Sequence, residues 1–185
     1  IEADEPRPIS DFDNMSLVEL IVKSGAAAAI NERLAKSVKS KEGISETIEN
    51  NVRSVLLKSQ LNDPVFFEKM SNLLDQIIQQ RKSQALDYEA YLVQIAELAK
   101  QVQDGGGEEM PASINTPELR VLYNNMGEDE ETAIALHEDL LANIPDGWRG
   151  VGPREQRVKQ VIYAIVENRA EVERLFAIIE QQVGY

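Results

Sequence analysis

The sequence predicts an all-α protein, built as an irregular bundle of about seven or eight helices. Apolar residues recur every three or four positions along most of the chain, which is the spacing of one helix face. Alternating apolar and polar residues bounded by turn residues, the pattern of strands, are not found. The 185 residues are 43% apolar, which is enough for a packed core in one domain or in two small ones.

The chain is expected to start with an extended lead-in over residues 1–13, because this stretch holds two prolines and five acidic residues. A capping-box pattern follows, in which the Ser16 hydroxyl and the Glu19 carboxylate would satisfy backbone amides at the start of a helix. Gly25 then leaves two outcomes open. It either separates a second short helix over residues 26–36 or is tolerated inside one longer helix.

The polar stretch 36–43 predicts a loop, and Ser45 is the expected N-cap of the next helix. Two consecutive helices are then predicted within residues 63–101. Asp63 is suited to cap the first of them, with a proline at its first position, and Asp87 is suited to cap the second. The bend between them lets their apolar faces close on each other.

The helices within 63–101 are expected to hold the core of the N-terminal half. Their apolar faces need partners, which the helical faces over 17–30 and 48–56 can supply. Each fully buried Phe, Leu or Ile side chain contributes roughly 1.5 to 3 kcal/mol before the entropy cost. We therefore predict that Leu74→Asp unfolds the chain and that Gln79→Asp, on the polar face, does not.

A linker is predicted at residues 104–112, because its first six residues are only glycine and acid, with high backbone entropy and nothing apolar to bury. It divides a helical part over 14–103 from a helical part over 113–185, and the two parts can still pack as one domain. Four helices are expected in the second part. They run from Thr116 to Gly127, from 128–131 to about Asn143, over 154–166 and over 170–182.

The net charge of −13 is concentrated in residues 104–146, which hold eleven acidic residues and one basic residue. Residues 14–103 are balanced, with eleven of each. Because affinity for DNA phosphates comes chiefly from positive charge, direct binding of nucleic acid is not expected. The acidic stretch is expected to be a solvated face, and a face for a basic protein partner stays open as the alternative.

The chain contains no cysteine, which excludes disulfides and thiolate chemistry and fits a reducing cytoplasm. No run of 18 apolar residues occurs, so contact with a membrane is not expected. Nor does a basic segment lead into an apolar one, as it would in a signal peptide. The first residue is isoleucine, and we interpret the chain as a fragment of a longer protein.

Sequence patterns for catalysis and ligand binding are nearly absent. Residues 150–154 lack the lysine and the hydroxyl residue of a phosphate-binding loop. The single histidine, His137, has no glutamate three residues before it, which excludes the usual di-iron motif, and we expect it on a helix face with a hydrogen-bond partner. The acidic cluster 128–139 lacks calcium-loop spacing, and Trp148 is expected to anchor a loop. We predict no catalytic, cofactor-binding or metal-binding residue and no small-molecule ligand.

Six segments of the chain carry a family resemblance through their order. They are SLVELIVKSG, ETIENNVR, DPVFFEKMSNLLDQIIQQRK, ALDYEAYLVQIAELAKQV, PASINTPELRVLYNNMG and DGWRG. In this order they resemble the C-terminal helical region of the motor and restriction subunit, the R subunit, of type I restriction enzymes. The resemblance covers about residues 15–150 and extends more loosely to the end, with departures at 151–154 and 181–185.

The resemblance implies that the complete R subunit is an ATP-dependent DNA translocase and endonuclease that uses ATP and Mg²⁺. No motor or nuclease motif occurs in this chain, so no catalytic residue is implied for it. What the resemblance implies here is a helical module that docks the motor onto the modification (methyltransferase) subunits of a bacterial restriction complex. Under this interpretation the fragment is not an enzyme, and it meets DNA through the full-length complex.

Two other interpretations stay open. A helical module that contacts DNA directly would use the basic residues within 23–58 or 149–174. A small enzyme would need an acid or base with a perturbed pKa, and His137 with the acids of 128–139 is the candidate for that role. The docking module is the leading hypothesis, because capped amphipathic helices and an acidic surface favour assembly over chemistry.

Overall fold

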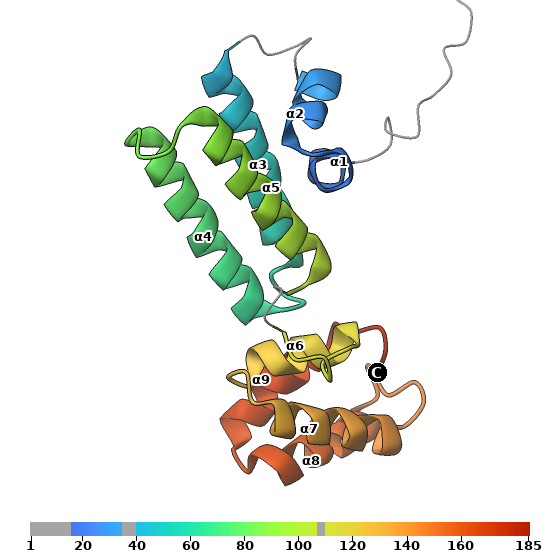
Figure 1. Cartoon of the computed structure of the whole chain (residues 1–185). Coiled ribbons are helices and arrows are strands. Elements are labelled where there is room, and N and C mark those ends of the chain that lie inside the picture. Colours follow the sequence, from blue (N-terminus) through green and yellow to red (C-terminus); the bar gives the residue numbers. More distant parts are fainter. Residues whose placement is uncertain (1–15, 35–39, 107–109) are drawn as a thin grey trace, which may run out of the picture. The chain divides into compact units, whose positions relative to one another are not determined.

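The computed structural model describes residues 16–34, 40–106 and 110–185, and all regular structure in these ranges is helical, which confirms the predicted all-α class (Figure 1). The expected lead-in over 1–13, and parts of the predicted loop and linker, lie outside the described residues. The elements are α1 (Leu17–Ser24), α2 (Ala26–Ala29), the π-helical turn η1 (Ile30–Leu34), α3 (Lys41–Ser59), α4 (Pro64–Lys82), α5 (Tyr88–Asp104), α6 (Pro117–Asn125), α7 (Glu130–Asn143), α8 (Gly152–Val166) and α9 (Arg169–Glu180).

The helices group into two compact units. Unit 1 contains the described residues up to Ser54 together with Leu73–Gln103, and unit 2 contains Val55–Asn72 together with Asp104–Tyr185. The division falls inside α3 and α4, so each of these two helices contributes residues to both units. The glycine-rich linker marks a division along the chain, whereas the two units reflect how the helices pack.

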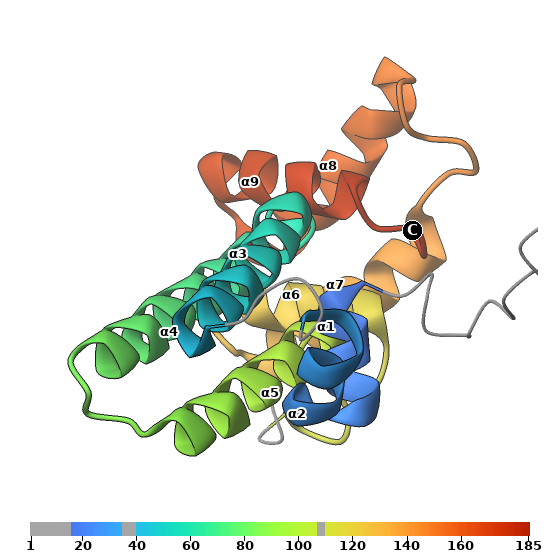
Figure 2. The same ribbon diagram turned by 90° about the horizontal axis from the view of Figure 1, so that it is seen from above.

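Unit 1 starts with the predicted capping box. The Glu19 backbone N–H donates to the Ser16 hydroxyl at 3.2 Å, and the Ser16 backbone N–H donates to the Glu19 carboxylate at 2.6 Å. Of the two outcomes open at Gly25, the separate helix is observed, because Gly25 takes a φ of +83° that ends α1 before α2 begins. Both short helices lie beside α5 in the two views (Figures 1 and 2).

The start of α3 corrects two expectations. The helix begins at Lys41, inside the loop expected over 36–43, because Ser40 caps it by accepting a hydrogen bond from the Gly43 N–H at 3.1 Å. Ser45, the expected cap, lies inside the helix, and its hydroxyl donates to the Lys41 carbonyl at 3.0 Å. Ser40 and Ser45 lie on either side of Ile44, the first buried apolar residue of α3, and both are of a residue type that caps helices, so the local pattern could not decide between them.

The core of unit 1 is formed by the parts of α3, α4 and α5 that belong to it. The predicted cap of α5 is confirmed, because the Asp87 carboxylate accepts a hydrogen bond from the Ala90 N–H at 2.8 Å. Leu74 is fully buried and Gln79 is exposed, as predicted. The buried apolar side chains of these three helices in unit 1 are Ile44, Ile48, Val52, Leu74, Ile77, Ile78, Tyr91, Ile95, Leu98, Ala99 and Val102.

Unit 2 packs α6 to α9 around an apolar core. Thr116 caps α6 as predicted by accepting a hydrogen bond from the Leu119 N–H at 3.2 Å, and Gly127 follows the helix with a φ of +74°. α8 begins earlier than expected, at Gly152, because Pro153 fits the first turn of the helix. The core consists of Ile114, Leu119, Leu122, Ala133, Leu136, Leu140, Trp148, Val158, Val161, Ile162, Val172, Leu175, Phe176 and Ile179.

Candidate functional site

Asp63 is the centre of a buried polar cluster in unit 2. As predicted, it caps α4, because its carboxylate accepts a hydrogen bond from the Phe66 N–H at 3.3 Å. The side-chain amides of Asn124 and Asn125, at the end of α6, donate to its two carboxylate oxygens at 2.7 Å and 2.6 Å. Asp63 is only 4% exposed. The cluster therefore joins the turn before α4 to the end of α6.

Asn125 extends this cluster to α9. The Arg174 guanidinium donates to the backbone carbonyl oxygen of Asn125 at 2.5 Å. It also donates to the two oxygens of the Glu171 carboxylate, at 2.5 Å and 2.9 Å. Burial raises the pKa of Asp63, and the hydrogen bonds from the two asparagines and a backbone amide oppose that rise. The hydrogen bonds to Asp63 come from neutral amides, and they offset only part of the cost of burying its charge.

Asp63 and Asp129 are expected to give opposite pH dependences of stability. Burial raises the pKa of Asp63 above its ordinary value of 3.8. Its contribution to the stability of the folded state is therefore fully present below pH 3.8 and is lost as the pH rises through the raised pKa. Asp129 caps α7, and the Thr132 backbone N–H lowers the pKa of its carboxyl below the ordinary value of 3.8. Its contribution to the stability of the folded state is therefore present above pH 3.8 and is lost as the pH falls through the lowered pKa.

Urea unfolding at a series of pH values checks this prediction. The stability advantage of the wild type over Asp63→Asn should shrink as the pH rises, and its advantage over Asp129→Asn should grow. If the stability advantage of the wild type changed with pH in the same way for both variants, the burial of Asp63 would not set its pKa.

Arg81 is the centre of a second polar cluster, in unit 1. Its Nε donates to the Glu49 carboxylate at 2.8 Å and its Nη1 donates to the Glu42 carboxylate at 2.7 Å, both on α3. The Arg81 and Glu49 side chains are 9% and 8% exposed, so solvent screens this ion pair little. The guanidinium carbon also lies 5.6 Å from the centroid of the Tyr91 ring on α5. The Tyr91 hydroxyl donates to the Ser45 carbonyl at 3.3 Å.

The pKa values of Arg81 and Tyr91 are both raised in this cluster. Burial lowers the pKa of Arg81, but hydrogen bonds to Glu42 and Glu49 outweigh burial and raise the pKa overall. Burial, with the charge of Glu49 next in size, raises the pKa of the Tyr91 phenol. The cluster therefore holds a permanent ion pair beside a neutral phenol. It joins α3, α4 and α5.

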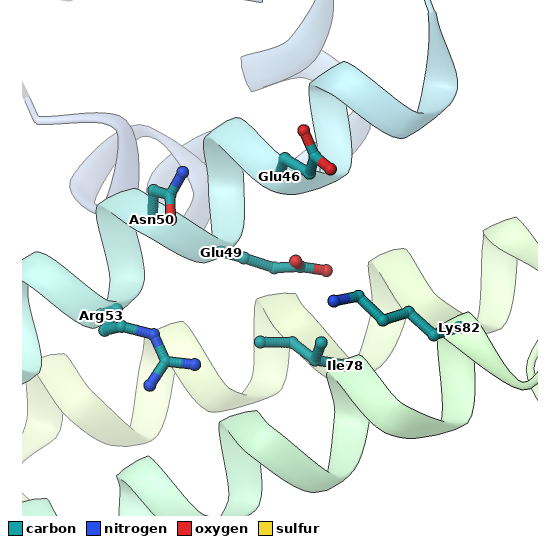
Figure 3. A pocket seen from close by; sticks show the side chains of 6 residues that line it. All are labelled: Glu46, Glu49, Asn50, Arg53, Ile78 and Lys82. Atoms are coloured by element: carbon teal, nitrogen blue, oxygen red, sulfur yellow. The ribbon is translucent and has the colours of Figure 1, made fainter.

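An open polar groove of about 330 Å³ lies beside this cluster. Figure 3 shows Glu49 from α3 and Lys82 from α4 extending toward one another across it. Arg53, also on its wall, is bound to Asp75 at 2.6 Å. The groove is lined by Glu46, Glu49, Asn50, Arg53, Ile78 and Lys82. This set combines carboxylates, an amide and cations with one apolar side chain, Ile78.

The loop over residues 146–150 is fixed by core packing and by two arginines. Trp148 is 2% exposed, and its ring packs edge to face on Phe176 with centroids 5.5 Å apart, which confirms the predicted loop anchor. The Arg149 guanidinium lies 4.6 Å from the Trp148 ring centroid. Arg154 donates to two carbonyl oxygens of the loop, at 2.8 Å and 3.2 Å. The DGWRG segment thus has a structural role in unit 2.

His137 lies half-buried on α7 and has a hydrogen-bond partner, as expected. Its Nδ1 is 2.5 Å from the Tyr185 hydroxyl, and the two rings meet edge to face with centroids 5.5 Å apart. Burial lowers the pKa of His137, although Glu118 and Glu138 oppose this. Burial, and then the charge of Glu118, raises the pKa of Tyr185. At neutral pH the pair is therefore an uncharged imidazole against an uncharged phenol.

The acidic residues of the stretch 128–139 have different structural roles. Asp129 caps α7 by accepting a hydrogen bond from a backbone N–H at 3.1 Å. Glu130 accepts a hydrogen bond from a serine hydroxyl of the preceding loop, and Glu128 pairs with Lys69 at 3.6 Å. Within the described ranges, no group of three His, Asp or Glu side chains is arranged to hold a metal ion. The stretch therefore serves helix capping and surface pairing.

Sequence reasoning missed Arg81, Asn125 and Arg149 as centres of tertiary contacts. Arg81 could have been found, because it falls three residues after Ile78 and continues the apolar stripe of α4 into the core. A charged residue on such a stripe needs a buried partner. Asn125 and Arg149 have no comparable local signal, since their partners lie far away in the sequence.

Comparisons with protein-family models, with curated proteins and with solved structures gave no match. Within the part of the chain that the structure describes, no helix is both long enough and apolar enough to cross a membrane.

Proposed function

We propose that this chain is a non-catalytic docking module from the C-terminal region of a type I restriction enzyme R subunit, and that it binds the modification subunits. The order of six sequence segments over residues 15–150 carries the proposal. ATP hydrolysis, Mg²⁺ binding, DNA translocation and DNA cleavage would belong to other parts of the full-length subunit. The assembly would act in the cytoplasm and meet DNA as a complete complex.

The structural roles of these segments support a scaffold more than an active site. The segment over 63–82 supplies Asp63, which caps α4, and the buried Leu74. The segment over 146–150 supplies Trp148, which is buried against Phe176. Residues that carry the resemblance therefore build cores and helix starts, which is what a module that presents a surface requires.

The outer face of α7 is our candidate for the docking surface. Glu131 and Glu138 are exposed and seven residues apart, so they lie on the same side of the helix. Asp129 and Glu130, by contrast, are occupied by hydrogen bonds inside unit 2. Two exposed carboxylates on one side of a helix suit basic side chains on a partner protein, where they steer association and select against wrong partners.

Direct contact with DNA is the weaker alternative. Six basic residues lie between positions 149 and 174. Arg149, Arg154, Lys159 and Arg174 among them bind carbonyl oxygens or carboxylates of unit 2. Lys159 and Arg174 are paired with carboxylates, which lowers the positive potential there, and Arg149 and Arg154 use their donors on carbonyl oxygens, which leaves fewer donors for phosphates.

A pull-down with the purified modification complex tests the proposal. The immobilised chain should retain the complex at about 1 μM, the affinity range of a specific but modest interface. The double variant Glu131→Lys, Glu138→Lys should lower retention at least about tenfold. The double variant Glu68→Lys, Glu97→Lys makes the same charge change at exposed positions on α4 and α5 and should not. Failure of the wild-type chain to retain the complex would count against docking.

The identity of the parent protein is tested separately from docking. The coding sequence upstream of Ile1 should encode a nuclease and a helicase-like motor in one reading frame with this chain. An unrelated upstream domain would remove the restriction-enzyme assignment, even if the chain bound another basic partner.

A further inference from the structure

We propose that residues 181–185 form a strap that opens from unit 2 while α6 to α9 stay folded, and that the hydrogen bonds of Arg149 hold this strap closed. The Arg149 guanidinium donates from all three of its nitrogens to backbone carbonyls at the end of the chain. Nε donates to the Glu180 carbonyl at 2.9 Å, Nη1 donates to the Tyr185 carbonyl at 2.6 Å, and Nη2 donates to the Gln182 carbonyl. One side chain thus spans the whole strap.

Tyr185 is the apolar anchor of the strap. Its ring packs against the core of unit 2, and its hydroxyl is 2.5 Å from Nδ1 of His137 on α7. Gly184, next to it, lies so close to the Glu118 carboxylate on α6 that a Cβ atom there would collide with it. The strap therefore contacts α6 through Glu118, α7 through His137 and the loop that carries Arg149.

The remainder of the strap is weakly held. The backbone amides of Gln181 and Gln182 donate to the last turn of α9, and the Gln182 side chain donates to the Asn62 carbonyl at 2.8 Å. Val183 is 97% exposed. A segment with few buried apolar contacts and solvent-exposed hydrogen bonds opens at a much lower free energy than the core it covers.

Opening of the strap changes what unit 2 presents to solvent. It frees the guanidinium donors of Arg149, the imidazole of His137 and the site of the Tyr185 ring, while the core around Trp148 stays packed through Phe176. The strap therefore controls access to this surface without unfolding the helices.

Spin labelling tests the strap directly, because the chain has no cysteine of its own. A nitroxide is attached at Val183→Cys, on the strap, and in a second sample at Ala177→Cys, on the exposed side of α9. Replacing Arg149 by Met keeps an apolar stem over Trp148 and removes the hydrogen bonds. It should raise the ratio of mobile to immobile label at position 183 about tenfold or more, with no change at position 177.

Two further variants complete the test. Tyr185→Ala removes the anchor from the strap itself, leaves the core residues in place, and should mobilise the label at 183 in the same way. Arg157→Met changes an exposed arginine on α8 and should alter neither label. An unchanged spectrum at 183 in both strap variants, or equal mobilisation at 183 and 177, would overturn the proposal.

Discussion

Leu74→Asp is expected to abolish the folded state of unit 1. Leu74 is 0% exposed at the centre of α4, so the substitution removes a buried side chain and places an unpaired carboxylate among apolar neighbours. Loss of a buried leucine alone costs roughly 2 to 5 kcal/mol, and we expect at least about 4 kcal/mol in total. That is close to the whole stability of a domain at the low end of the usual range of about 5 to 15 kcal/mol. Helicity measured by circular dichroism should fall at 25 °C.

Gln79→Asp is the matched control for this prediction. It introduces the same side chain into the same helix at an exposed position, so it should change the free energy of unfolding by less than about 1 kcal/mol. If Leu74→Asp unfolded at the same denaturant concentration as Gln79→Asp, α4 would not be a core helix of unit 1.

Arg81→Met is expected to give the second-largest loss of stability. The substitution leaves the Glu49 carboxylate, which is 8% exposed, without its ion-pair partner. Removing one member of a buried ion pair costs roughly 3 to 5 kcal/mol, because the remaining charge stays desolvated. The midpoint of urea unfolding should fall accordingly. The double variant Arg81→Met, Glu49→Leu should recover most of the loss, since it leaves no buried unpaired charge: Glu42, which also loses its partner, is 63% exposed.

Arg53→Met provides the matched control for Arg81. It breaks an ion pair between the same two helices, with Asp75, but these side chains are 43% and 57% exposed. Exposed pairs contribute at most about 1 kcal/mol. Equal losses for Arg53→Met and Arg81→Met would show that burial does not set the importance of the Arg81 cluster.

Local features of the sequence predicted the helices well. The apolar spacing placed α4 and α5 and identified Leu74 as buried, because a helix face is defined by residues three and four apart. Asp63, Asp87 and Thr116 were predicted as caps, and the structure confirms all three. A cap and its helix lie within a few residues of each other, so their relation is visible in the sequence.

Features that depend on distant residues could not be predicted in this way. The contact of Asp63 with Asn125 joins positions 62 residues apart, and nothing near either residue specifies the other. The hydrogen bonds of Arg149 to the strap reach 36 residues along the chain. The grouping of Val55–Asn72 with the C-terminal helices follows from such tertiary packing, whereas the glycine-rich linker is a local signal.

We propose that this chain binds the modification subunits of a type I restriction complex. Sedimentation velocity of the fluorescently labelled chain, titrated with the purified modification complex, measures that binding in solution. We predict that the labelled chain moves into a faster, saturable species with half-saturation at or below about 1 μM, equivalent to about −8 kcal/mol. A labelled chain that still sediments alone at about fifty times that concentration, while its circular dichroism spectrum shows it to be folded, would contradict the claim.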